Sequence, residues 1–199
     1  GQVEYLTTMK YIRECLAQLS EPTILEVGAG TGRYSVTLAK QGYRVTAVEL
    51  ILHNFELLKL KLDGSEQITA MQGNALDLSV LPDASFSLTM LLGPMYHLYT
   101  REDKVMELNM LTPDWHCVSE PKDLFEMVRI EDIASLDAEL PVERIKLIAT
   151  DGATNYKREY IDEMDDETFY KWIEYHFTIC ERQDLIGASH HTLDILRKK

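Results

Sequence analysis

Residues 24–32 read ILEVGAGTG, and this stretch decides the fold. A short apolar run that ends in closely spaced glycines predicts a buried strand turning sharply into a helix, because glycine is needed where φ is positive or where a ligand approaches the backbone. Ligands of open α/β sheets bind at the carboxyl ends of the strands. Glu49 ends the next predicted strand, where a carboxylate can accept hydrogen bonds from both hydroxyls of a ribose. The stretch and Glu49 together predict a nucleoside-binding site.

The spacing of the glycines indicates the kind of nucleoside. Dinucleotide enzymes carry G-x-G-x-x-G, whose loop presents a helix N-terminus to a pyrophosphate. Here the glycines run G-x-G-x-G, and Arg33 stands at the place of the third dinucleotide glycine. Glu26 lies two residues before the first glycine, where it can meet an ammonium group. A ligand with a ribose, an adenine and a cationic amino-acid tail fits this pattern better than a pyrophosphate does.

Strand and helix patterns alternate on both sides of this stretch. Alternation of this kind is typical of a parallel sheet with helices on both faces. The apolar periodicity predicts strands over 23–27, 44–49, 68–71, 86–92, 142–149 and 192–196. It predicts helices over 4–19, 33–41, 51–62, 156–163 and 167–182, the last with the acidic residues before it as its N-cap.

On these motifs, residues 23–99 resemble a class I S-adenosylmethionine-dependent methyltransferase. The resemblance implies a doubly wound, Rossmann-like α/β fold: a mostly parallel seven-stranded sheet with helices on both faces and an antiparallel last strand. It implies S-adenosylmethionine as cofactor and S-adenosylhomocysteine as product. The segment QGNALD (72–77) matches the third motif of the family, which reads adenine and usually has Asp where this chain has Asn74. The segment LLGPMYHL (91–98) matches the fourth-strand motif, which borders cofactor and substrate.

The resemblance assigns a cofactor site residue by residue. The glycine loop and the acid before it flank the methionine moiety, and the acid at the tip of the second strand takes the ribose hydroxyls. The cofactor-binding residues expected are Glu26, Gly28, Ala29, Gly30, Thr31, Gly32, Tyr34, Glu49, Leu50, Asn74, Ala75 and Leu92.

Two residues of the fourth-strand motif are candidates for catalysis. His97 has the side chain whose ordinary pKa suits a general base at neutral pH. The ring of Tyr96 can line the substrate or the sulfonium site, since an aromatic face attracts a methyl-bearing cation. The alternative is that both residues only shape the pocket. No metal site is expected. His190 and His191 precede the last predicted strand, and adjacent side chains on a strand point to opposite faces, so the two cannot bind one ion.

Residues 1–199 are expected to form a single domain. It comprises an N-terminal lid helix (1–20), a cofactor-binding half (23–99) and a substrate-side half (100–199). Tyr11 lies off the apolar stripe of the first helix and is expected to face the cofactor or solvent. His176 lies on an apolar stripe and is expected in the core. No turn and strand follow the helix that begins at 101, so we expect residues carrying the fifth strand to be missing near 103–113.

Composition restricts the partners. The chain of 199 residues has 33 acidic and 20 basic side chains, a net charge of −13, which disfavours nucleic acid and anionic membranes. There is no apolar run of about 18 residues, no signal-peptide pattern at residue 1 and no cysteine framework. We therefore expect a cytoplasmic methyltransferase acting on an O, N or S nucleophile of a small molecule, with its oligomeric state open. The alternatives are a non-catalytic cofactor-binding module and a protein or RNA methyltransferase, although no Asn-Pro-Pro-Tyr or Asp-Pro-Pro-Tyr motif follows the fourth strand.

Overall fold

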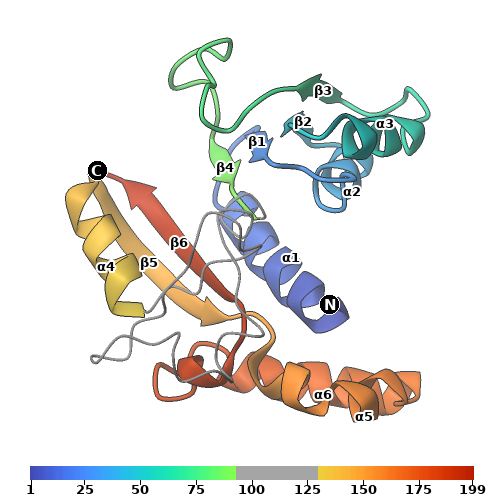
Figure 1. Ribbon diagram of the computed structural model, residues 1–199, viewed down its shortest axis with the longest axis vertical. Helices are drawn as coiled ribbons and strands as arrows, with labels where there is room; N and C mark the ends of the chain where they lie inside the picture. Colours follow the sequence, from blue (N-terminus) through green and yellow to red (C-terminus); the bar gives the residue numbers. More distant parts are fainter. Residues whose placement is uncertain (93–129) are drawn as a thin grey trace, which may run out of the picture. The chain divides into compact units, whose positions relative to one another are not determined.

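The structure, a computed structural model, describes residues 1–92 and 130–199 (Figure 1). These residues form two compact units: a glycine-loop unit from residue 15 onward, and a terminal unit of residues 1–14 with 130–199. The described elements are α1 (Gln2–Leu16), β1 (Thr23–Val27), α2 (Ser35–Lys40), β2 (Arg44–Glu49), α3 (Leu52–Leu60), β3 (Ile68–Gln72), β4 (Leu88–Met90), α4 (Ile130–Glu139), β5 (Val142–Ala149), η3 (Gly152–Lys157), α5 (Arg158–Asp162), α6 (Asp166–Ile179), η4 (Ile186–Ala188) and β6 (Thr192–Lys198).

The glycine-loop unit contains a four-stranded parallel sheet in the order β3-β2-β1-β4. Parallel pairing follows from the helical connections, since α2 links β1 to β2 and α3 links β2 to β3. The register aligns Val27 with Val48 and Glu49 with Gln72, so β1, β2 and β3 end at one edge. The predicted α/β class and parallel sheet are confirmed, and the bounds predicted for β1 and β2 are those observed.

The four-stranded sheet has a dense apolar core beneath the glycine loop. Ala29, Val36, Ala47 and Leu58 are buried together, which joins the loop to α2, β2 and α3. The predicted helix over 33–41 begins at Ser35, and the predicted strand over 86–92 is shorter, Leu88–Met90. The described strands form sheets of four and two, so the seven-stranded sheet stays a prediction. The expected gap near 103–113 lies outside the described residues.

The terminal unit is built on an antiparallel pair, β5 and β6, with a register shift between Arg144 and Lys146 (Figure 1). The first turns of α1 belong to this unit, where Tyr11 packs with Ile148 and Cys180. The expectation that Tyr11 faces cofactor or solvent is wrong: its side chain is 1% exposed. Its hydroxyl donates a hydrogen bond to Glu181 Oε1 (2.7 Å), so the tyrosine buries its ring while its polar end is satisfied. The assignment of residues 1–20 as a lid and of the whole chain as one domain stays a prediction.

Helix α6 bears out two expectations about the C-terminal third. His176 is buried at 2% exposure on the same face as Ile173. The carboxylate of Asp165 accepts a hydrogen bond from the backbone N–H of Thr168 (2.8 Å), which makes it the N-cap. The predicted positions of His176 in the core and of the acidic cap are confirmed.

Gly32 tests how tightly the loop is packed. Its φ is +77°, and a Cβ there would lie 2.7 Å from Val36 Cγ2 and 2.8 Å from Leu58 Cγ. We expect Gly32→Ala to lower the free energy of unfolding by about 2–4 kcal/mol, from left-handed strain and overpacking together. The matched control is Gly64→Ala, at φ +91° with nothing within 4 Å of the added Cβ; it should cost only about 1–2 kcal/mol. Urea unfolding measures both, and equal losses would contradict the packing described for Gly32.

Candidate functional site

The glycine loop leaves β1 in a conformation that other residues adopt only with strain. Gly28, Gly30 and Gly32 have φ values of +73°, +55° and +77°. The backbone N–H groups of Gly28 and Ala29 both donate to the carbonyl oxygen of Val48, at 2.8 and 3.0 Å. A Cβ at Gly30 would meet nothing within 4 Å, in contrast to Gly32. The loop is therefore tied to the end of β2 on one side and is open at Gly30 on the other.

Glu49 holds this loop against the start of α3. Its carboxylate Oε2 accepts from the backbone N–H of Gly30 (2.7 Å), and its Oε1 accepts from the backbone N–H of Ile51 (2.9 Å). The residue is 5% exposed. Each carboxylate oxygen has a second lone pair, so the group can still accept from two hydroxyls of a ligand. Glu49 is thus oriented by the backbone before any ligand binds.

Glu26 provides a second buried carboxylate beneath the same loop. It is 2% exposed, and its Oε2 accepts a hydrogen bond from the backbone N–H of Ser35 (2.8 Å). Burial raises the pKa of Glu26 to about 7, and the negative charge of Glu49 acts in the same direction, whereas the hydrogen bonding of Ser35 opposes the rise. In the part of the chain that the structure describes, the buried Ser35 hydroxyl has no hydrogen-bond partner.

A cavity of about 250 Å³ opens at the carboxyl ends of β2 and β3. Within the third motif, Asn74 Oδ1 accepts from the backbone N–H of Leu76 (3.0 Å), which closes a turn. Gly73 packs close to β2, since a Cβ there would lie 2.9 Å from Val48 Cγ1. The cavity is lined by Val48, Met71, Gln72, Gly73, Asn74, Asp77, Leu78, Val80 and Leu81.

Most of the predicted cofactor residues belong to this one edge of the sheet. Leu50 follows β2 and is 52% exposed, and Ala75 is exposed beside Asn74. Tyr34, half-buried, is the N-cap of α2 and makes no side-chain capping bond. Leu92, half-buried, follows β4. Both candidates for catalysis, Tyr96 and His97, lie outside the described residues.

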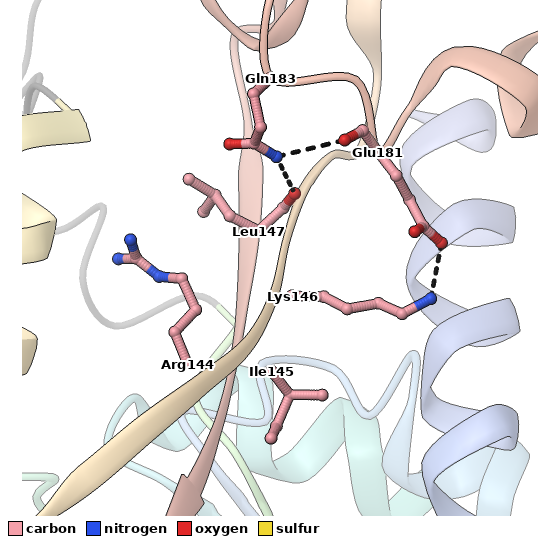
Figure 2. A pocket seen from close by; sticks show the side chains of 6 residues that line it. All are labelled: Arg144, Ile145, Lys146, Leu147, Glu181 and Gln183. Carbon is pink, nitrogen blue, oxygen red and sulfur yellow. Dashed lines mark hydrogen bonds and ion pairs between the residues drawn. The ribbon is translucent and has the colours of Figure 1, made fainter.

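A second cavity, of about 310 Å³, lies in the terminal unit along β5 (Figure 2). Its cations are already neutralised. The guanidinium of Arg144 contacts the carboxylates of Asp137 (2.6 Å) and Asp194 (2.7 Å). Lys146 Nζ contacts Glu181 Oε1 at 2.7 Å, as Figure 2 shows. Because each positive charge has a carboxylate partner, this cavity offers no surplus charge for an anionic ligand.

The terminal unit contains a polar cluster that sequence reasoning did not bring together. Asp151 Oδ1 accepts from the Ser189 hydroxyl (2.6 Å) and from the backbone N–H groups of His190 and His191. Its Oδ2 contacts His191 Nδ1 (2.6 Å) and accepts from the side-chain amide of Asn155. The two histidines were weighed only as metal ligands. Asp151 is buried and hydrogen-bonds to residues about 40 positions further along the chain, and no local sequence pattern predicts such a contact.

The pKa values of two histidines near Asp151 are shifted in opposite directions. The hydrogen bond that His191 donates to Asp151 holds the pKa of His191 above its usual value, against the opposing effect of burial. Burial holds the pKa of His176 below its usual value. Among the described residues there is no cluster of histidine, cysteine and carboxylate side chains that could hold a metal ion. No described helix is long and apolar enough to cross a membrane.

Comparison with known proteins identifies the class of the glycine-loop segment. Residues 24–111 match the family model described as a methyltransferase domain. This match covers the loop, Glu49 and the third motif, the features that form one edge of the sheet. Residues 24–111 therefore carry a methyltransferase domain, in agreement with the resemblance to a class I S-adenosylmethionine-dependent methyltransferase that the motifs predicted.

Individual relatives share only parts of the chain. An rRNA adenine N-6-methyltransferase of Escherichia coli is 32% identical over 75 residues, which is 36% of this chain and 31% of that protein. Two solved structures cover 49% of the chain: WbdD (19% identity, 23% of its chain, TM-score 0.41) and the CcbJ methyltransferase of Streptomyces caelestis (22% identity, 38% of its chain, TM-score 0.39). The chain thus spans about a third of the length of its curated relative.

His191 gives a prediction for the terminal unit. A histidine whose pKa is raised in the folded state contributes stability that is fully present below its unfolded pKa of about 6.5 and is lost as pH rises through the folded value. We expect His191→Gln to be destabilised relative to the unmodified chain by on the order of 0.5–1 kcal/mol more at about pH 6 than at about pH 9. Urea unfolding at both pH values measures this difference.

The matched control is His190→Gln, since His190 is exposed and its ring meets the edge of Tyr156. The free energy of unfolding of that variant should differ from that of the unmodified chain by the same small amount at both pH values. His176 is present in all three proteins, so its own pH dependence cancels. A loss in His191→Gln that does not vary with pH would contradict the assignment of a charged Asp151–His191 pair.

Proposed function

We propose that this protein transfers a methyl group from S-adenosylmethionine to a small-molecule O, N or S nucleophile, leaving S-adenosylhomocysteine. The observation that carries the proposal is the geometry of Glu49, held by two backbone amides at the tip of β2 beside an open glycine loop. In this arrangement Glu49 takes the ribose hydroxyls and the loop lies against the methionine moiety. Asn74 and Ala75 border the adenine, with Leu50 offering an exposed apolar side chain beside it.

Methyl transfer requires mainly that the protein position the acceptor nucleophile and the cofactor correctly. The acceptor nucleophile displaces the methyl group in line, and the protein contributes orientation and exclusion of water. A base is needed only where the nucleophile must lose a proton. Two buried carboxyl groups, Glu26 and Glu49, adjoin the loop, and negative charge on them favours a ligand carrying a cationic sulfonium and an ammonium group.

The second candidate acceptor is RNA. The relative from E. coli is named for methylation of rRNA, which favours this possibility. The charge balance of the chain opposes it, because 33 acidic against 20 basic side chains give a net charge of −13, and binding to a phosphate backbone depends on clustered Lys and Arg. A small-molecule acceptor therefore has the stronger support.

The ribose assignment predicts a loss of cofactor affinity on changing Glu49. Glu49→Gln keeps the shape but removes the charge and one acceptor oxygen. We expect the affinity for S-adenosylmethionine to fall by about 1–3 kcal/mol, which is the cost of leaving a buried polar group unpaired. Isothermal titration calorimetry measures this change. Glu56→Gln, which removes an exposed carboxylate from α3, is the matched control and should bind as tightly as the unmodified chain.

An unchanged affinity in Glu49→Gln would contradict the ribose assignment. Preference for NAD over S-adenosylmethionine would contradict the proposed cofactor. Formation of S-adenosylhomocysteine against a panel of metabolites and rRNA would distinguish the two acceptor classes.

His97 remains our proposal for a base, with Tyr96 lining the methyl-transfer site. We expect His97→Ala to lose on the order of 10²–10⁴ in turnover with little change in cofactor affinity. Steady-state kinetics and calorimetry on the same preparation measure both quantities. A loss of affinity with turnover intact at saturation would support a pocket-shaping role instead.

A further inference from the structure

Two buried carboxylates lie at the glycine loop, and the described residues give them different numbers of hydrogen-bond donors. Both oxygens of Glu49 accept backbone hydrogen bonds. For Glu26, the hydrogen bond found in the described part of the chain is the one from the backbone N–H of Ser35 to Oε2. Glu26 is also the more buried of the two. A carboxylate with few donors in a dry site is costly to ionise.

We infer that Glu26 is a charge sensor of the cofactor site: its carboxyl group releases a proton to solvent when cationic S-adenosylmethionine binds. This inference rests on the proposed function and adds a regulation of that same site by pH. In the step, the O–H bond of the Glu26 carboxyl breaks and the buffer takes the proton. The carboxylate that remains is balanced by the positive charge of the ligand.

The described residues around Glu26 supply no compensating positive charge, which a cationic ligand would provide. From β2, the charged group acting on Glu26 is Glu49, which is itself negative. From α2 the neighbour is Ser35, and the register partners on β2 and β4 are Ala47 and Met90, none of them charged. Among the described residues, no positively charged side chain lowers the pKa of Glu26.

The negative charge of Glu49 opposes the ionisation of Glu26. Burial and Glu49 together hold the pKa of Glu26 at about 7 in the unliganded protein, so the carboxyl is protonated in about half of the molecules at neutral pH. A nearby cation favours the charged form and lowers the pKa. Binding therefore shifts the group toward its carboxylate and releases a proton.

The sign of the pH effect follows from this linkage. Below the pKa of the free protein, a cationic ligand must displace a proton, and its affinity rises with pH. Above that pKa the carboxylate is already formed and the affinity levels off. Between about pH 6 and about pH 8 the affinity should rise by at most about tenfold, with up to about half a proton released per ligand near pH 7.

The ligand's own charge provides an internal comparison. S-adenosylmethionine carries a sulfonium charge that S-adenosylhomocysteine lacks, while both keep the ammonium and carboxylate of the amino-acid tail. The product should therefore release fewer protons and show a weaker pH dependence. Glu26 would then favour the charged cofactor over the neutral thioether product increasingly as pH rises through about 7.

The test is calorimetric titration of the full chain with S-adenosylmethionine, at about pH 7, in two buffers of different ionisation enthalpy. The difference in observed heat gives the number of protons released. We expect release in the unmodified chain, less release with S-adenosylhomocysteine, and none in Glu26→Gln, whose affinity should not vary between about pH 6 and about pH 8. Far-UV circular dichroism and thermal unfolding check that Glu26→Gln is folded.

Two controls separate Glu26 from other groups of the unit. Glu56→Gln removes an exposed carboxylate, and His53→Asn removes the imidazole of α3. Both should retain the proton release. Release that persists in Glu26→Gln, or that disappears in His53→Asn, would overturn the inference.

If Glu26→Gln does not fold, titration of the unmodified chain still tests the role of Glu26. Binding of S-adenosylmethionine with no proton exchange and no change of affinity with pH would overturn the role of Glu26 while leaving the proposed function in place. Absence of binding at every pH would overturn the proposed function itself. The two failures are thereby distinguishable.

Discussion

The carboxylate of Glu49 is the constraint on which the cofactor site depends. It links the open part of the glycine loop at Gly30 to the entry of α3 at Ile51 through two backbone hydrogen bonds. It is buried, so these bonds satisfy a charge that would otherwise be costly. The same bonds leave one lone pair on each carboxylate oxygen for a ligand. Under the proposed function, the side chain that holds the loop in place also binds the ribose.

The second carboxylate of the loop has a different character. Glu49 accepts hydrogen bonds from two backbone N–H groups, whereas Glu26 accepts one from the backbone N–H of Ser35. Negative charge at both positions is expensive without a ligand and favourable with a cationic one. Under the proposed function, this difference lets the two acids bind a positively charged cofactor without both carrying a charge in its absence.

The sequence predicted the glycine-loop unit well because its signals are local. The apolar run before Gly28 and the loop glycines determine β1 and the turn, and the bounds of β1 and β2 agree with prediction. The parallel pairing of these strands was predicted from the alternation of strands and helices, whereas their order β3-β2-β1-β4 was not. The role of Glu49 was predicted from its place at the end of β2, although its two backbone partners were not.

The terminal unit was less predictable because its interactions join distant parts of the chain. Tyr11 was expected at a surface, but it packs against Cys180 and bonds to Glu181. Helical periodicity places a residue on a face and does not say which element covers that face. The Asp151 cluster joins the end of β5 to the residues before β6, which no local pattern indicates.

Hydrogen–deuterium exchange of the full chain tests the central claim most directly, because it reports on the loop, Glu49 and the third motif at once. With S-adenosylmethionine, exchange should slow in residues 28–35, 49–52 and 72–78, and NAD should leave these segments unchanged. Slowing by NAD alone, or no slowing by S-adenosylmethionine at saturating concentration, would contradict the assignment of this edge of the sheet as the cofactor site.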